Sequence, residues 1–340
     1  MRFKEGLCGI GALALCLLAL GGPARADEKG IDNPKRTPYL EKLAGKRVVF
    51  VPMARGIDLV EAWIPTMQKQ ADKYGYTLEV RDPNWSTDAG ARVIEGVIGE
   101  KPDLLVVHNS DIQSYVRLYQ QAERAGLKVL QLNMESAYPT DGYVGADWVA
   151  IGERLAERLV EHCAAGKGPS TKIAIMQGVP TGAADIYQMH GMYDVLDRHP
   201  EIQVVSQQST GYDANKANAV METVLKQHPD LCGAMGIWDN MDVGTGSAVI
   251  QAGKQDQVYV VTSGGGSQTS CQNVERGIFD AYLSFNAPLQ GELLNARISE
   301  LLESDQPAGA TKTTFFTPLT WIEAADVNKR NCWSLEDVRD

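Results

Sequence analysis

Short apolar runs alternate with longer amphipathic segments from residue 48 to about residue 132. Short apolar runs are typical of buried strands, whereas apolar residues at every third or fourth position are typical of helices with one buried face. Because strands separated by helices need crossover connections, this region is predicted to form an α/β doubly wound (Rossmann-like) domain with a mainly parallel sheet. Its strands are predicted at Val48–Pro52, Thr77–Arg81, Leu104–Val107 and Val129–Leu132, with helices at about 59–74, 88–99 and 114–125.

The same alternation begins again after about residue 150 and predicts a second doubly wound domain. A helix is also predicted at about 289–302 and a strand at Thr313–Phe316, and these two elements have to be divided between the two domains. The chain is therefore expected to cross between the domains more than once. The polar, Pro-containing stretch 27–46 predicts an extended or loosely packed lead-in. The strands of the second domain are predicted at 173–176, 204–207, 233–237, 258–261 and 281–284, with helices at about 151–163, 184–198, 214–227, 243–252 and 269–276.

These elements predict two lobes joined by a multi-strand hinge. The first lobe is expected to comprise residues 27–146 plus about 287–312, and the second lobe residues 147–286 plus about 313–340. Ligands of such sheets bind beyond the carboxyl ends of the strands. With two lobes, those ends can face each other across a cleft that closes around a small ligand.

The first 26 residues have the pattern of a secretory signal peptide. Arg2 and Lys4 precede an apolar run from Leu7 to Leu20, which is followed by Ala24-Arg25-Ala26. The run is short and Gly-rich for a membrane span, so we predict cleavage after Ala26 and a periplasmic location. The alternative is an uncleaved membrane anchor.

The formal net charge of −11 argues against nucleic acid or an anionic membrane as a partner. Four cysteines follow the signal segment, which in an oxidising compartment permits two disulfides. The order of the predicted elements favours Cys163 with Cys232 and Cys271 with Cys332, and the alternative is free buried thiols.

The sequence lacks the motifs that would indicate an enzyme or a metal site. The five histidines have no zinc-type spacing, and neither a Walker-type loop nor a G-x-S-x-G elbow is present. We therefore predict no metal, no cofactor and no catalytic activity.

Four segments together resemble a known family. Tyr143–Gly152 is similar to its "YVGSDN…G" segment, Gln177–Ala184 to "G-P-P-G-x-x-A-A", Trp238–Gly244 to "NDEMALG", and Phe285–Gly291 to a hinge segment. The family is that of the type I periplasmic substrate-binding proteins of ABC transporters, in particular its ribose- and galactose-binding group. The resemblance implies that fold, with hinges near 143–146, 285–287 and 310–313.

The resemblance also indicates which residues face the ligand, although the family's charged sugar contacts are largely replaced. Asp239 follows a strand and is expected to contact the ligand, with a helix-capping role as the alternative, whereas for Asp147 the cap is favoured. Arg55 is expected either to reach the ligand or to be solvated. The other expected contacts are aromatic or neutral: Asn133, Gln188, Trp148, Trp238, Asn240, Phe285, His108 and Asn109. Core packing is the alternative for Trp148 and Trp238, and is the expectation for Trp63, Trp85, Trp321 and Trp333.

The sequence thus predicts a periplasmic solute-binding protein that captures a small neutral ligand, such as a sugar, a polyol or a related compound. Its partner is expected to be an inner-membrane ABC permease, and the chain is expected to be a monomer. The alternative is a periplasmic sensor whose closed form is presented to a membrane histidine kinase.

Overall fold

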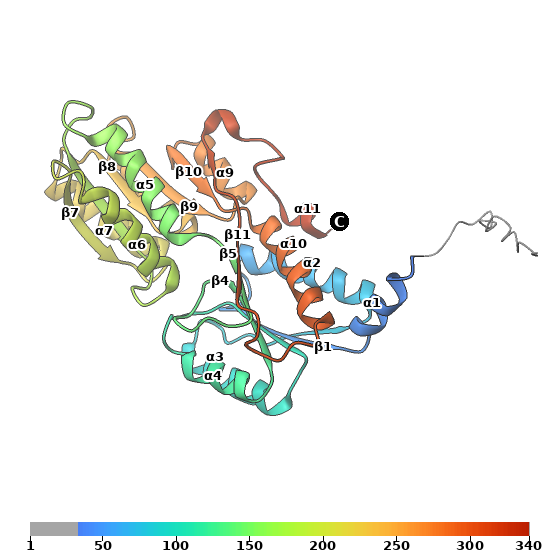
Figure 1. Cartoon of the computed structure of the whole chain (residues 1–340). Helices are drawn as coiled ribbons and strands as arrows, with labels where there is room; N and C mark the ends of the chain where they lie inside the picture. The colour runs from blue at the N-terminus through green and yellow to red at the C-terminus, as the bar shows by residue number, and fades with distance from the viewer. Residues whose placement is uncertain (1–32, 340) are drawn as a thin grey trace, which may run out of the picture.

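The computed structural model describes residues 33–339 and contains two lobes, each built on a six-stranded sheet (Figure 1). The predicted signal peptide and its cleavage after Ala26 lie outside the described residues. Within residues 33–339, no helix has both the length and the apolar character needed to cross a bilayer.

The first sheet has the strand order β11-β5-β4-β3-β1-β2, and all of its strands run parallel. Alternate residues of its strands face opposite layers of helices. Val49 and Val51 pack with α3 and α4, whereas Val48 and Phe50 belong to the core on the side of α2 and α10. This period of two is expected for strands with both faces covered. The strands are β1 (Arg47–Val51), β2 (Thr77–Val80), β3 (Leu104–Val107), β4 (Lys128–Asn133), β5 (Gly142–Gly145) and β11 (Thr313–Phe316); the helices are α1 (Arg36–Leu43), α2 (Asp58–Tyr74), α3 (Thr87–Glu100), α4 (Val116–Arg124) and α10 (Ala287–Glu303).

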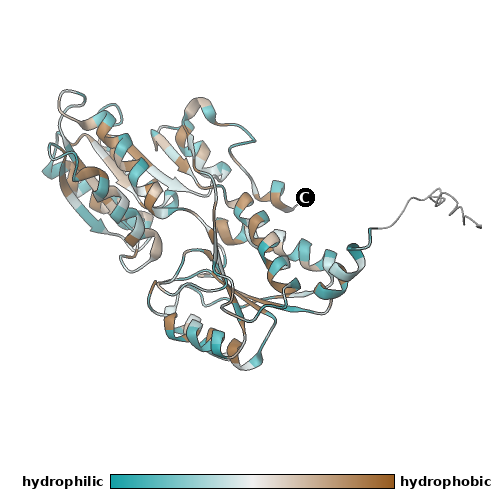
Figure 2. Ribbon diagram, viewed as in Figure 1, coloured by the Kyte–Doolittle hydropathy of each residue, from teal (hydrophilic) through white to brown (hydrophobic). Residues whose placement is uncertain are grey.

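The second sheet has the order β12-β10-β9-β8-β6-β7 and is parallel except at its β12 edge. Helices α5 and α6 pack together, as do α7 and α8. Figure 2 shows mixed hydrophobic and hydrophilic residues along the helices, as expected for helices that cover a sheet with one face. The strands are β6 (Lys172–Gln177), β7 (Gln203–Ser209), β8 (Gly233–Gly236), β9 (Tyr259–Gly264), β10 (Ala281–Ser284) and β12 (Thr320–Ile322); the helices are α5 (Trp148–Cys163), α6 (Ala183–Leu196), α7 (Ala214–Gln227), α8 (Asp239–Gln251) and α9 (Gln268–Glu275).

The chain passes between the lobes at three places: after β5, after β10 and after β11. The three crossing segments meet at Thr317. Its hydroxyl oxygen lies 2.7 Å from the carbonyl oxygen of Phe285 and 3.3 Å from that of Gly145. The α/β fold with several crossings is confirmed, and the crossings form one bundle of hinge segments.

Two predictions of the domain boundaries differ from the structure. The segment Thr313–Phe316 was expected at the start of the second lobe's tail, but it pairs with β5 in the first sheet, so the third crossing follows Phe316 rather than residue 312. The stretch 27–46 was expected to be extended or loosely packed, yet Arg36–Leu43 forms α1, whose Leu43 is buried in the core.

The tail beyond β12 contacts both lobes. After a short 3-10 helix, η1 (Ala324–Asp326), Cys332 forms a disulfide with Cys271 of α9, and the Trp333 indole N–H donates to the Gly265 carbonyl at 2.7 Å. The last helix, α11 (Leu335–Arg339), packs against α2 of the first lobe. The second disulfide joins Cys163 to Cys232, so both predicted pairings are confirmed.

Candidate functional site

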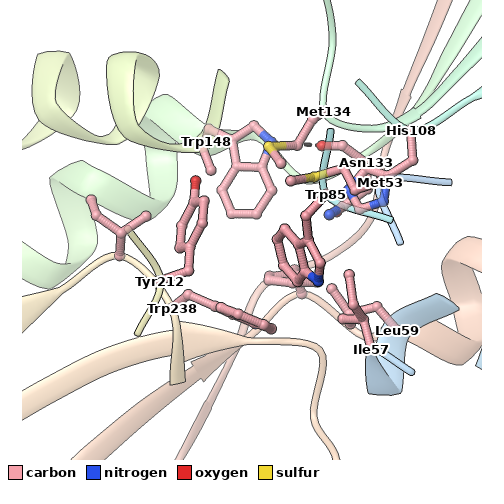
Figure 3. A pocket seen from close by; sticks show the side chains of 13 residues that line it. Met53, Ile57, Leu59, Trp85, His108, Asn133, Met134, Trp148, Tyr212 and Trp238 are labelled. Atoms are coloured by element: carbon pink, nitrogen blue, oxygen red, sulfur yellow. Dashed lines mark hydrogen bonds between the residues drawn. The ribbon is translucent and has the colours of Figure 1, made fainter. Parts of the chain in front are cut away.

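A cavity of about 410 Å³, a volume that includes space open to solvent, lies between the lobes (Figure 3). Most of its lining residues lie at or just beyond the carboxyl ends of strands or at the first turns of the helices that follow them. This is where parallel sheets place their ligands. The lining consists of Met53, Ile57, Leu59, Trp85, His108, Asn133 and Met134 from the first lobe, and Trp148, Ala184, Tyr212, Ile237, Trp238 and Phe285 from the second lobe and its crossing segment.

Aromatic rings dominate this lining. Trp148 and Phe285 meet edge to face with their ring centroids 5.2 Å apart, and Tyr212 and Trp238 do the same at 5.7 Å. Figure 3 shows the rings of Trp85, Trp148, Tyr212 and Trp238 around one common space. Such edge-to-face pairs hold the rings in fixed orientations. The cavity therefore offers flat apolar surfaces from both lobes.

The lobes are also connected by polar contacts close to the cavity. The Trp148 indole N–H donates to the backbone carbonyl of Asn133 at 2.7 Å, across the boundary between the lobes. On the first-lobe side, the side-chain oxygen of Asn133 accepts from Gln290 of α10 at 3.1 Å. Asn133 thus lies in the wall with its side-chain oxygen and its backbone carbonyl already hydrogen-bonded.

His108 lines the cavity with both of its ring nitrogens lacking hydrogen-bond partners among residues 33–339. Its side chain is buried and meets Trp63 edge to face, and among the described residues neither ring nitrogen has a hydrogen-bond partner. Burial lowers the pKa of His108 to about 3, so the imidazole is neutral. A neutral imidazole offers one donor and one acceptor.

Asp239 does not line the cavity, although it was expected to point into the cleft. Its carboxylate accepts from the Ser270 hydroxyl at 2.6 Å and from the Tyr282 hydroxyl at 2.8 Å. Gly264 allows this placement, because a Cβ there would lie 2.2 Å from a carboxylate oxygen. Burial is the main cause that raises the pKa of Asp239 to about 7, and the nearby Asp58 contributes. The structure thus places Asp239 outside the cavity lining.

Four other expected contacts also lie outside the lining because their side chains have partners elsewhere. Gln188 is buried and donates to the Ile237 carbonyl at 3.1 Å. Asn109 donates to Gln131 and to the Met134 carbonyl.

The remaining two are Asn240 and Arg55. Asn240 donates across the lobes to Asp58 at 3.4 Å. Arg55 forms a bidentate ion pair with Glu61. Neither residue lines the cavity, and their roles in ligand binding stay predictions. Asp147, by contrast, caps α5 as expected, accepting from the Ala150 N–H.

Several lining residues were not expected from the sequence. Trp85 was expected to pack in the core but is 48% exposed and lines the cavity, whereas Trp63 and Trp333 are buried as expected. Trp85 and Tyr212 both lie in loops and have positive φ values of 64° and 62°. The position of each after a predicted strand was the available signal, but their left-handed backbone, which turns the ring inward, is not visible in the sequence. Met53, Ile57, Leu59, Met134, Ala184 and Ile237 were also missed.

The residues present do not suggest a metal or cofactor site. Within residues 33–339, no three His, Cys, Asp or Glu side chains are grouped as metal ligands. Within the same range, the residues that line the cavity include no Asp, Glu, Lys or Arg. The geometry is suited to enclosing a small molecule.

Comparisons with known proteins agree with this geometry. The family model described as "Periplasmic binding protein domain" matches residues 48–306. The ribose import binding protein of Bacillus subtilis is 24% identical over 271 residues, which cover 79% of this chain and 81% of that protein. The D-ribose/D-allose-binding protein of Pseudomonas aeruginosa is 28% identical over 197 residues, which cover 57% of this chain and 61% of that protein.

Solved structures show the same architecture. An ABC transporter solute-binding protein from Agrobacterium vitis, bound to α-D-tagatopyranose, has a TM-score of 0.74 at 20% identity and covers 84% of this chain and 99% of its own. A glucose–galactose binding protein from Geobacillus stearothermophilus has a TM-score of 0.72 at 18% identity, covering 83% and 99%. The type I periplasmic binding protein fold is confirmed. These proteins are named as binding proteins, in agreement with the prediction that the chain is not an enzyme.

Proposed function

Because the chain belongs to the periplasmic binding protein family, we propose that it captures a small uncharged solute between its lobes and delivers it to an ABC importer. The observation that carries this proposal is the cavity itself, which both lobes line without any charged side chain among residues 33–339. The relatives bear the names of sugar-binding and sugar-import proteins, which favours import over the sensor alternative. We expect a monomer in the periplasm.

The mechanism follows from where the contacts arise. A ligand that touches Trp85 of the first lobe and Trp238 of the second lobe makes both contacts only when the lobes are close together. Its binding free energy therefore stabilises the closed arrangement over any open one. The three crossing segments that meet at Thr317 are the hinge about which such a motion would occur. An importer that recognises the closed arrangement would then receive loaded protein.

The test is a ligand screen on the mature protein with two readouts. Sugars, polyols, small alcohols and aromatic compounds are titrated while tryptophan fluorescence and the radius of gyration from X-ray scattering are followed. We expect a saturable fluorescence change together with a smaller radius of gyration, because Trp85, Trp148 and Trp238 line the cavity. Turnover of a bound compound, or binding that leaves the radius of gyration unchanged, would contradict capture by closure. The scattering mass tests the monomer.

A further inference from the structure

The cavity wall is more apolar than we expect for a site that binds a sugar. Five aromatic residues and six aliphatic or thioether residues form eleven of the thirteen lining positions, which leaves only His108 and Asn133. A sugar carries a hydroxyl group on nearly every carbon. Each buried hydroxyl without a partner costs about 1–3 kcal/mol, so an apolar wall disfavours such a ligand.

Three polar groups next to the cavity are already engaged with protein partners. The Tyr212 hydroxyl donates to Asp185 at 2.7 Å, and the Trp148 indole N–H donates to the Asn133 carbonyl. The Asp239 carboxylate, the group that would accept from two adjacent sugar hydroxyls, instead accepts from Ser270 and Tyr282. A sugar hydroxyl that paired with one of these three groups would have to displace an internal bond.

His108 is a lining residue that could form a polar contact with a ligand. Its two ring nitrogens are buried at the wall, and no described residue satisfies them. Leaving a donor and an acceptor buried without partners is costly, so a ligand oxygen that reaches the imidazole would gain free energy. The neutral ring favours a hydroxyl or carbonyl over a carboxylate, and within residues 33–339 no Lys or Arg lines the cavity to balance an anion.

We propose that this cavity takes an uncharged, mainly apolar ring compound with a hydroxyl or carbonyl oxygen directed at His108. The rings of Trp85, Trp148, Tyr212 and Trp238 would pack against the faces of the ligand ring. This inference rests on the proposed function, because it names the ligand class of the same site. It departs from the sugars that appear in the names of the relatives.

Calorimetric titration of the mature protein tests the inference with probes that differ in one property at a time. Benzyl alcohol is the ring compound with a hydroxyl group, toluene lacks the oxygen, D-ribose and D-allose are the sugars, and benzyltrimethylammonium carries a positive charge. We expect benzyl alcohol to bind at least tenfold more tightly than each of the other probes.

The variant His108→Leu separates the hydrogen bond from the packing. It should weaken benzyl alcohol at least tenfold while leaving toluene within about twofold, and the unchanged toluene affinity also shows that the cavity is still folded. The control is His190→Leu, because the His190 side chain is 65% exposed on α6. That variant should bind both probes like the natural protein.

The outcomes distinguish this inference from the proposed function. Tighter binding of D-ribose, D-allose or benzyltrimethylammonium than of benzyl alcohol would overturn the ligand class and leave solute capture intact. Saturable binding of benzyl alcohol without a smaller radius of gyration would support the ligand class and contradict capture by closure. The absence of saturable benzyl alcohol binding would overturn the inference.

Discussion

The two lobes support the same cavity with different polar chemistry. Beneath the strand ends of the first lobe, an uncharged network is centred on the Gln131 side chain. Gln131 accepts from Asn109 and from the Ser136 N–H, and it donates to the Tyr138 carbonyl and to the Thr140 hydroxyl. All four hydrogen-bonding positions of its carboxamide are used. The first-lobe network therefore contains no group that titrates near neutral pH.

The second lobe instead uses three buried carboxyl groups at the corresponding place. Asp242 accepts from the hydroxyls of Thr245 and Thr262, and Asp185 accepts from Tyr212 and Gly178. Asp239 accepts from the hydroxyls of Ser270 and Tyr282. Burial is the largest cause that raises the pKa of Asp242 to about 8, and those of Asp185 and Asp239 to about 7. The comparison shows that polar residues at strand ends serve as scaffolding in both lobes, but that only the second-lobe network responds to pH.

The sign of that response follows from the direction of the pKa changes. Each carboxyl group binds its proton more tightly in the folded chain than in the unfolded chain, where its pKa is near 3.8. Between pH 4 and about 7 the folded state therefore holds more protons, so the free energy of unfolding rises as the pH falls through this window. This contribution is lost as the pH rises to about 8. Asp58, Glu135 and Asp141 of the first lobe, whose pKa values are also raised by burial, add in the same sense.

The largest effect is expected from breaking the uncharged network. Gln131→Leu keeps the approximate volume but removes four hydrogen bonds of the network, so we expect a loss of about 3 kcal/mol in the free energy of unfolding. The loss should be the same at pH 5 and pH 8, measured by urea unfolding. Gln207→Leu, at an exposed position of β7, is the matched control. A loss below 1 kcal/mol would mean that the network does not support the lobe.

A smaller effect should separate the two lobes by pH. Asp242→Asn replaces the carboxyl group by a neutral amide, so the variant lacks that group's titration. We expect its free energy of unfolding to fall by about 2 kcal/mol less than that of the natural protein between pH 6 and pH 8. Unfolding curves across this range measure the difference, with the exposed Asp256→Asn as control. Parallel pH profiles for the two proteins would show that Asp242 does not titrate as described.

The smallest effect concerns the hydroxyl group that joins the wall to the second-lobe network. Tyr212→Phe keeps the ring in the cavity and removes one donor from Asp185, so we expect a loss of about 1 kcal/mol. Thermal unfolding at pH 7 measures it. Tyr193→Phe is the control because Tyr193 is exposed and its hydroxyl donates to Gln207 at the surface. Equal shifts for the two variants would argue against a structural role for the Tyr212 hydroxyl.

The fold could be predicted where local pattern decides it. The apolar runs that became β1, β3, β6 and β8 are fully or almost fully buried, and such runs identify strands without knowledge of their neighbours. The segment Thr313–Phe316 was also predicted as a strand. Its sheet was misassigned because pairing with β5 is a long-range contact that no local pattern encodes.

The candidate site could be predicted in part for a related reason. Strand ends identify the positions of His108, Asn133 and Trp238, and these residues do line the cavity. The direction of a side chain depends on its surroundings, however. Asp239 turns away because Gly264 leaves room and Tyr282 supplies a donor. Such arrangements depend on neighbours that are distant in the sequence.

The three crossings also set the order in which the protein can be completed as it is made. Residues 147–286 supply five of the six strands of the second sheet before α10 and β11 of the first lobe have been synthesised. Until then, the first sheet lacks its β11 edge and the helix that covers part of one face. A nascent chain that ends at residue 286 would therefore expose apolar surface in the lobe whose strands came first. Synthesis of the first lobe thus starts before that of the second lobe, but the first lobe is complete only after most of the second lobe has been made. Domains that fold one after another along the chain do not have this order.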